Sequence, residues 1–257
     1  MLSPYAKNEW LTIIAVGACV GLSLVLLGYW PGAVGIGVAT LAVLTFFRDP
    51  DRRIPSPRNI VVAPADGKIS SIHEVEHFPP FDGPAVCVRV FMSVFDVHVN
   101  RCVCHGKVAS ITHQPGNHGN TLNPESIEDN ESMTTLFVHP VKGHPVAAVR
   151  QVAGLLARTI HNGLRDEQVV QRGQRMGIIK LGSTSELYLP ANLKPDVLVK
   201  QGQKVLAGMT VLANVTPLDP AEGLPPQITL FASPTEDDGG DGEPSVFAEK
   251  DPASSPR

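Results

Sequence analysis

Apolar residues are concentrated in one long run near the amino terminus. From Leu11 to Phe47 the chain has no charged side chain, a length sufficient for two membrane crossings of roughly 20 residues each. Trp30-Pro31-Gly32 divides the run, and proline begins helices well whereas glycine breaks them. We therefore expect two apolar helices, at about residues 11–29 and 33–47, joined by a tight turn. The second is short, so whether it crosses completely stays open.

From Ile60 to about Phe231 the pattern changes to short Val- and Ile-rich runs separated by glycine and proline, which predicts strands. Residues 169–178 and 199–208 share one pattern: a β-like run, a Gly-Gln turn and a second β-like run. This pattern is typical of small flattened barrels such as the biotinyl/lipoyl-like fold. Residues 146–160 are apolar enough for either state, and we expect a strand followed by a short helix.

The predicted fold is β-rich α+β, a flattened barrel or sandwich with a biotinyl/lipoyl-like strand pattern, preceded by an N-terminal transmembrane helical hairpin. We expect a membrane anchor at residues 1–50, a folded domain at 51–232 and a tail at 233–257. The tail is rich in Pro, Gly, Ser and acidic residues. Because it cannot bury enough apolar surface to fold, we predict that it is disordered.

Charge and cysteine content narrow the classes of function. The net charge is −4, and the acidic tail accounts for it, so the remainder is not basic enough to suggest nucleic-acid binding. The four cysteines fit no CxxC or zinc-finger spacing, and Cys102-Val103-Cys104-His105 lacks a second pair of ligands. We therefore expect free thiols in a reducing compartment and no metal site.

The residues that flank the apolar run predict its orientation. The positive-inside rule places the arginines that follow it in the cytoplasm, and with them the whole domain. A cleaved secretory signal is the competing interpretation, but the amino terminus carries only Lys7, balanced by Glu9, and the run far exceeds an apolar region of about 7 to 15 residues. The expected location is therefore the cytoplasmic face of the cell (inner) membrane. The arginines are Arg48, Arg52, Arg53 and Arg58.

Residues 87–101 begin as a buried β-like run and change character at their end. Asp96, His98 and Asn100 alternate with valines, which places three polar side chains on one face of a strand. A solvated strand end is the ordinary interpretation. A histidine that leaves an apolar strand is also held rigidly enough to serve as a general base with a pKa near the working pH.

Asp66 and Ser183 each have an ordinary interpretation as turn residues. Asp66 stands before a glycine between two β-like runs, and Ser183 stands in Gly182-Ser183-Thr184-Ser185. Two familiar functions do not fit the second motif. A lipid hydrolase would need G-x-S-x-G, and a lipoyl or biotin carrier would need a lysine at the hairpin tip. The serine therefore stands where a carrier would have its lysine.

Taken together, these motifs resemble those of the phosphatidylserine decarboxylase proenzymes, in the family's order over about residues 46–213. Several motifs in one order are specific, whereas LGST by itself would be weak. The chain departs from the family at Asn130-Glu131-Ser132, where an N-E-R segment is usual, in a region expected near the substrate headgroup. The matching stretches are residues 46–52, 63–68, 91–101, 151–154 with Ala157-Arg158, 173–177 and 181–184.

The resemblance implies a self-processing enzyme. Gly182-Ser183 would be the scissile bond, with Ser183 attacking the glycine carbonyl and becoming a pyruvoyl group. His98 matches the family's base, and Asp66 matches the acid that orients it. The pyruvoyl group would form a Schiff base with phosphatidylserine, and phosphatidylethanolamine and CO2 would be released. No metal or external cofactor is implied.

The implied partners are phosphatidylserine, membrane lipid and the two self-cleaved chains as a heterodimer, with homo-oligomerisation left open. Two alternatives stay open as well. One is a decarboxylase of a related phosphoserine lipid, such as an archaeal ether lipid. The other is a membrane-tethered barrel that binds without catalysis, which predicts a chain that stays intact.

Overall fold

A computed structural model describes the chain except for residues 58, 120, 122–123, 155–158, 181–182 and 217–257. The predicted acidic tail and Gly182 therefore lie outside the described residues. The short helix expected at the end of residues 146–160 falls mainly on 155–158, which also lie outside them. The strand expected before it is present as β7 (Pro145–Val152).

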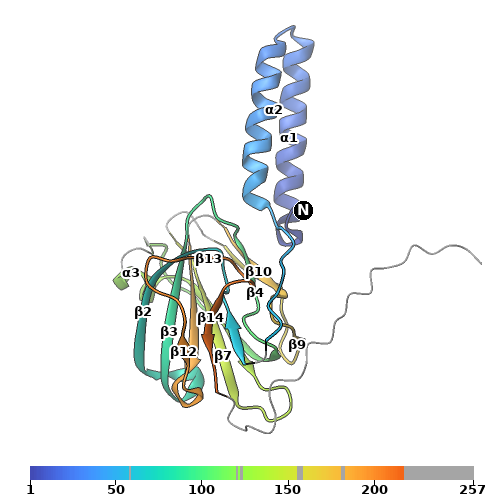
Figure 1. Ribbon diagram of the computed structural model, residues 1–257. Coiled ribbons are helices and arrows are strands. Elements are labelled where there is room, and N and C mark those ends of the chain that lie inside the picture. Colours follow the sequence, from blue (N-terminus) through green and yellow to red (C-terminus); the bar gives the residue numbers. More distant parts are fainter. Residues whose placement is uncertain (58, 120, 122–123, 155–158, 181–182, 217–257) are drawn as a thin grey trace, which may run out of the picture. The chain divides into compact units, whose positions relative to one another are not determined.

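The amino-terminal run forms two antiparallel helices, α1 (Lys7–Leu26) and α2 (Trp30–Leu44), with a 3-10 turn before the first and another, Thr45–Phe47, after the second (Figure 1). Both begin three or four residues earlier than predicted. Pro31 does not delay α2, because a first-turn proline loses no intrahelical hydrogen bond. Neither helix has a buried residue, and both spans are long and apolar enough to cross a membrane.

The two helices approach closely where Gly17 of α1 faces Thr40 of α2. A Cβ atom at Gly17 would lie 2.4 Å from Thr40 Oγ1, so a larger side chain there would push the helices apart. Small residues that let backbones approach are typical of helix pairs in membranes, where lipid removes the hydrophobic driving force between helices. The packing therefore fits a hairpin surrounded by lipid.

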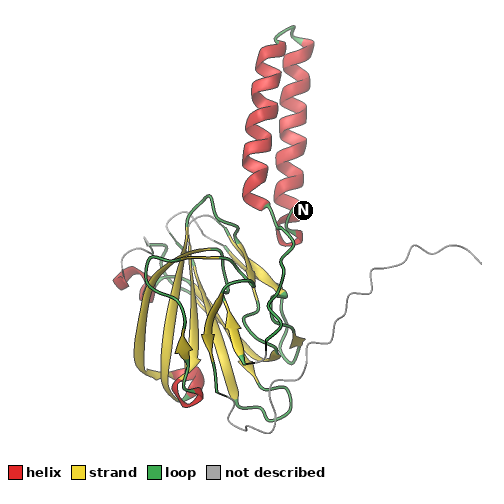
Figure 2. Ribbon diagram, viewed as in Figure 1, coloured by secondary structure: helices red, strands yellow, loops and turns green. Residues whose placement is uncertain are grey.

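The β-domain is a curled antiparallel sheet, a half-barrel, accompanied by two small sheets (Figure 2). Its eight strands are, in spatial order, β13 (Lys204–Val205), β2 (Gly67–Phe78), β3 (Gly83–Met92), β11 (Ser183–Pro190), β7, β6 (Ser132–Val138), β5 (Gly106–Gln114) and β9 (Val169–Val170). One small sheet contains β1 (Ile60–Val62), β14 (Val211–Asn214) and β12 (Asp196–Val197). The other contains β4 (Val99–Arg101), β10 (Arg175–Ile179) and β8 (Ile160–Asn162). A short helix, α3 (Pro124–Asp129), lies in the connection before β6.

The two repeated stretches form the same local turn. Gly173 and Gly202 both have positive φ, and in each case the following glutamine bonds back through its side chain to the amide three residues earlier. The strands that flank the two turns belong to different sheets, however. The repeat is therefore a local signal for a turn, and the biotinyl/lipoyl-like strand pattern is not confirmed.

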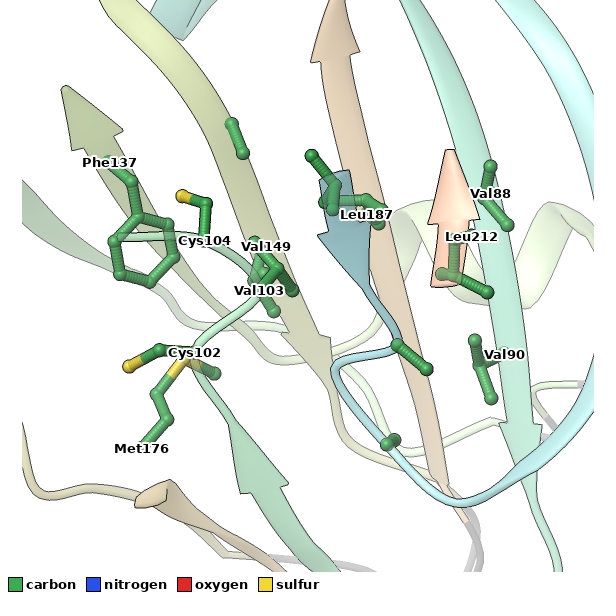
Figure 3. Close-up of a cluster of buried hydrophobic side chains, with 14 of the residues drawn as sticks. Val88, Val90, Cys102, Val103, Cys104, Phe137, Val149, Met176, Leu187 and Leu212 are labelled. Carbon is green, nitrogen blue, oxygen red and sulfur yellow. The ribbon is translucent and has the colours of Figure 1, made fainter. Parts of the chain in front are cut away.

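The main core lies between the inner face of the large sheet and the small sheets (Figure 3). It is built by the alternation expected of strands, in which every second side chain points to one face. Cys102 and Cys104 lie within this core as free thiols, and burial raises the pKa of Cys104 to about 12. The labelled members are Val88, Val90, Cys102, Val103, Cys104, Phe137, Val149, Met176, Leu187 and Leu212.

The other face of the same strands buries a charged cluster. Glu186 of β11 accepts hydrogen bonds from Arg89 Nε at 2.7 Å, from Arg150 Nη1 at 3.3 Å and from Tyr188 Oη at 2.9 Å. The ring of Tyr188 stacks on that of Phe78 with centroids 4.0 Å apart. All three charged groups are thus paired as well as buried.

Residues 87–101 do not form the single strand that the apolar pattern suggested. β3 ends at Met92, and β4 begins only at Val99. Between them, the amide and hydroxyl of Ser93 donate to Asp96 Oδ2 at 2.8 and 2.7 Å and close a turn. Side chains of this kind compete with strand pairing for backbone donors, which explains the break. Asp96 therefore closes a turn and does not share a strand face with His98.

Candidate active site

Ser183 is the first residue of β11, between β3 and β7, and it is fully buried. It lies opposite Met92 of β3 in the strand register. Among the described residues its Oγ has no hydrogen-bond partner, and the same is true of the hydroxyls of Thr184 and Ser185. Buried polar atoms are normally paired, so three successive exceptions call for an explanation other than stability.

His98 lies between the Ser93–Asp96 turn and β4, and it is fully buried. Its carbonyl accepts the amide of Ile179 at 3.3 Å, which places it beside the strand that leads toward the predicted cleavage site. Its Nδ1 is 2.9 Å from the carbonyl oxygen of Asp96. The ring of Phe46, from the turn after α2, lies against it with centroids 4.3 Å apart. The end of the apolar hairpin thus packs directly on the candidate base.

The surroundings keep His98 neutral. Burial lowers the pKa of its imidazole to about 4, despite the opposing effects of the Asp96 carbonyl and carboxylate, and Arg48 lowers it further. The expected pKa near the working pH is therefore not what the structure shows. At neutral pH the ring is unprotonated, which is the form that can accept a proton from a hydroxyl.

Asp66 lies at the same end of the sheet as Ser183. Lys68 pairs with Phe91, and Phe91 pairs with Thr184, so Asp66 and Ser183 are two strands apart, about 10 Å by ordinary strand spacing. Gly67 is required beside it, because at φ +153° a Cβ atom would lie 2.1 Å from the Phe91 carbonyl oxygen.

The contacts of Asp66 differ from those that the resemblance implies. Its Oδ1 accepts the Ala207 amide at 2.7 Å, and its Oδ2 pairs with Arg52 Nη2 at 2.7 Å. The hydrogen bond that the structure shows for Nδ1 of His98 goes to a backbone carbonyl, that of Asp96. The described contacts thus bring Asp66 together with Arg52, whereas its orientation of His98 remains a prediction.

The sequence did not predict that two amide side chains would pair with each other near Ser183. Gln151 Nε2 donates to Asn100 Oδ1 at 2.7 Å, and Asn100 Nδ2 lies 3.7 Å from the sulfur of Met92, the residue opposite Ser183. Gln151 itself lies opposite Ser185. A signal was present, because Gln151 is a polar residue inside an apolar strand, but that pattern does not reveal its partner.

The segment that follows the hairpin also makes contacts with the β-domain. Asp49 is buried and accepts a hydrogen bond from Arg101 Nη2 at 2.8 Å and another from Arg175 Nε. With the pairing of Arg52 and Asp66, these contacts fasten the segment to the domain. Arg52, one of the arginines that follow the apolar run, therefore has a structural partner that no charge count could identify.

The described residues near Ser183 can be compared with the prosthetic group that the resemblance implies. Within the described part of the chain, no cluster of three or more His, Cys, Asp or Glu side chains is placed to hold a metal ion. Ser183 has a buried hydroxyl with no hydrogen-bond partner among the described residues, and it is the residue from which a pyruvoyl group would be made. The residues present thus fit that group.

Comparison with known proteins agrees with these features. Residues 39–213 match the family model described as phosphatidylserine decarboxylase. Three similar curated proteins are each named phosphatidylserine decarboxylase proenzyme. The one from Rhodopirellula baltica is 37% identical over 221 residues, covering 82% of this chain and 91% of the relative. Those from Granulibacter bethesdensis and Paramagnetospirillum magneticum are 41% and 40% identical, covering 78% and 86% of this chain and 82% and 89% of the relatives.

Proposed function

The chain belongs to the phosphatidylserine decarboxylase family, and we propose that it cuts itself between Gly182 and Ser183 to generate a pyruvoyl group for this reaction. Its activity is the conversion of phosphatidylserine to phosphatidylethanolamine and CO2. The observation that supports self-processing best is the buried hydroxyl of Ser183, which has no hydrogen-bond partner in the part of the chain that the structure describes. A neutral histidine, His98, is held close to the strand that precedes the cut.

The proposed cleavage uses groups of the chain alone. Ser183 Oγ attacks the carbonyl carbon of Gly182, and its proton passes to neutral His98. The C–N bond breaks as the nitrogen takes up a proton, which leaves Gly182 joined to Ser183 as an ester. Loss of the Ser183 α-proton expels the Gly182 carboxylate, and hydrolysis with release of ammonia leaves a pyruvoyl group at position 183.

A pyruvoyl group at position 183 would supply a sink for the electrons left behind by CO2 in the decarboxylation. We propose that His98 would hold or deliver a proton in this step. Gln151 and Asn100 are hydrogen-bonded to each other beside Met92, the residue opposite Ser183, and this contact would keep the surroundings of Ser183 rigid. Asp66, which is paired with Arg52, would orient His98, the role that the resemblance to the family implies.

The strand pairing explains why the two cleaved chains would remain together. After the cut, β11 would belong to the smaller chain and its neighbours β3 and β7 to the larger one. β11 is paired with β3 along its whole length and with β7 from Thr184 to Tyr188. Separation would break both ladders and expose the core face of β11, so we expect a stable heterodimer.

We further propose that the apolar hairpin anchors the enzyme on the cytoplasmic face of the cell membrane. Support comes from two exposed helices of spanning length and from the arginines that follow them. A tether of this kind raises the effective concentration of a lipid headgroup at the site. It also leaves both ends of the hairpin on the side of the β-domain.

Intact-mass analysis of the purified full chain tests the processing step. We expect two polypeptides separated between Gly182 and Ser183, the smaller one beginning with a pyruvoyl mass in place of serine. Ser183→Ala should remain one chain without activity. Ser185→Ala is the matched control, because it removes an equally buried hydroxyl from the same strand, and it should still cleave. A parent chain that stays intact in membrane lipid would contradict the proposal.

A further inference from the structure

We infer that the Ser93–Asp96 turn is a second membrane contact, with Val94 and Phe95 inserted at the boundary between lipid headgroups and acyl chains. This inference rests on the proposed membrane anchoring and extends it to the site itself. The turn lies between β3 and β4 and directly precedes His98. It would bring the candidate base to the level at which a phospholipid headgroup is presented.

The tip of the turn is apolar, exposed and rigidly held. Phe95 is 84% exposed and Val94 is 39% exposed. Ser93 donates twice to the Asp96 carboxylate, and the Asp96 amide donates back to the Ser93 carbonyl at 3.0 Å. A phenyl ring that the turn holds exposed to water contributes no stability to the fold. At a membrane interface, by contrast, aromatic side chains are favoured.

A contact with the hairpin sets the depth of this tip. The guanidinium of Arg48 donates to the carbonyl oxygen of Phe95 and, at 3.0 Å, to that of Thr45. Arg48 directly follows the second apolar span, which ends at Phe47. An arginine at the end of a span lies at the interface, where anionic lipid attracts it. Phe95, bonded to the same guanidinium, therefore lies at the same level.

Exposure alone would not identify this turn. Val141 is 86% exposed, but it lies in the turn between β6 and β7. That turn is at the far end of the sheet, because the near ends of β6 and β7, Ser132 and Val152, lie in register with Thr184. Val141 is thus an exposed apolar residue without a membrane neighbour, and it provides a matched control.

The turn also couples the membrane to His98. The carbonyl of Asp96, its last residue, holds Nδ1 of His98, and Phe46 from the end of the apolar span packs against the ring. Insertion of the tip into lipid would therefore restrict the motion of the Asp96 carbonyl and of Phe46, the two groups that contact His98. We expect loss of the tip to weaken the use of phosphatidylserine in a bilayer, with little effect on a soluble analogue.

Spin labels at the two turns test the location directly. Phe95→Cys and Val141→Cys are prepared separately in a Cys19→Ser background, since the other cysteines are buried. The full chain is reconstituted in vesicles of phosphatidylethanolamine and phosphatidylglycerol. We expect the label at 95 to be reached more readily by oxygen than by a polar nickel chelate, and the label at 141 to show the reverse. Equal preference for the chelate at both positions would overturn the inference.

Kinetics provide a second test that separates the turn from the chemistry. Phe95→Ser should lower kcat/KM about tenfold on phosphatidylserine vesicles, as expected for a modest loss of apolar burial. Its activity on a short-chain phosphatidylserine below its micellar concentration should stay near that of Val141→Ser. Equal losses on both substrates would overturn the membrane role, because they would indicate damage to the site. If the parent enzyme used neither substrate, the proposed function would fail while the spin labels still decided the location.

Discussion

Consecutive residues of β11 bury polar groups in opposite ways. Ser183, Thr184 and Ser185 are fully buried, and their hydroxyls have no partner among the described residues. Glu186 is equally buried but accepts hydrogen bonds from three side chains. All four residues lie in a strand with continuous pairing to β3. The backbone is therefore regular in both regions. The difference lies in the hydrogen-bond partners of the side chains.

The comparison separates groups that hold the fold from a group kept available for reaction. A buried hydroxyl left without a partner costs about 1–3 kcal/mol, which selection for stability alone would remove. A buried ion cluster is tolerated only when every member is paired, as Glu186 is. We propose that Ser183, at the beginning of β11, serves the self-cleavage, and that Glu186 and its partners serve the stability of the fold. Substitutions at the candidate base should therefore change cleavage, whereas substitutions around Glu186 should change stability.

Replacing the candidate base should have the largest effect. We expect His98→Ala to slow self-cleavage by roughly 100- to 10,000-fold, the usual contribution of a positioned general base. The measurement is the time course of the intact mass after synthesis. His73→Ala, an exposed histidine in β2, is the control and should cleave normally. Normal cleavage by a folded His98→Ala chain would assign the base to another residue.

Breaking the paired cluster should reduce stability and spare the chemistry. Glu186→Gln leaves Arg89 and Arg150 buried without a full countercharge, which we expect to lower the free energy of unfolding by about 3–5 kcal/mol. Tyr188→Phe removes only one donor and should cost about 1 kcal/mol. Thermal unfolding of the cleaved enzyme measures both. If Tyr188→Phe were the more damaging change, the cluster would not be held by its charges.

Acid should reveal the buried histidine. The pKa of His98 is about 4 in the folded chain, below an unfolded value of about 6.5, so the unfolded state takes up the proton first. This group therefore contributes stability above pH 6.5, and that contribution is lost as the pH falls toward 4. The loss is about 3 kcal/mol.

Comparison of unfolding at pH 7 and pH 4.5 measures this loss, and His98→Gln is the control because it cannot titrate. The variant should be less sensitive to acid than the parent, since the remaining histidines are the same in both. An unchanged acid sensitivity would show that His98 is accessible to protons in the folded chain. His98 would then take up a proton in the folded chain as readily as a surface histidine does.

Local patterns in the sequence predicted the architecture better than its details. The uncharged run predicted the helical hairpin, and Val-rich runs predicted the strands, because both signals depend on spacing alone. The boundaries of α2 were misplaced, because Pro31 lies in its first turn and does not precede the helix. The repeated Gly-Gln stretches predicted turns correctly, but a turn does not specify which sheet its strands join.

At the site, residue types were predictable and their partners were not. Ser183 and His98 could be identified from motifs. Ser183 begins β11 and His98 contacts β10, and both positions are compatible with the proposed roles. The carbonyl that holds His98, the pairing of Asp66 with Arg52 and the contact of Gln151 with Asn100 join residues through the folded sheet. Hydrogen bonds between distant segments leave no periodic trace in a chain.

The sequence by itself determined that this protein has an apolar hairpin, a β-rich domain and a serine at a motif typical of self-processing enzymes. The first two follow from composition and short-range spacing, and the third from the resemblance of several motifs to one family; none of them requires knowledge of the fold. Only the tertiary structure decided that Ser183 is buried without a hydrogen-bond partner among the described residues, that His98 is neutral and that the Phe95 carbonyl contacts Arg48 at the end of the apolar hairpin. Burial, pKa and depth depend on which distant residues surround a group, and that environment exists only once the chain has folded.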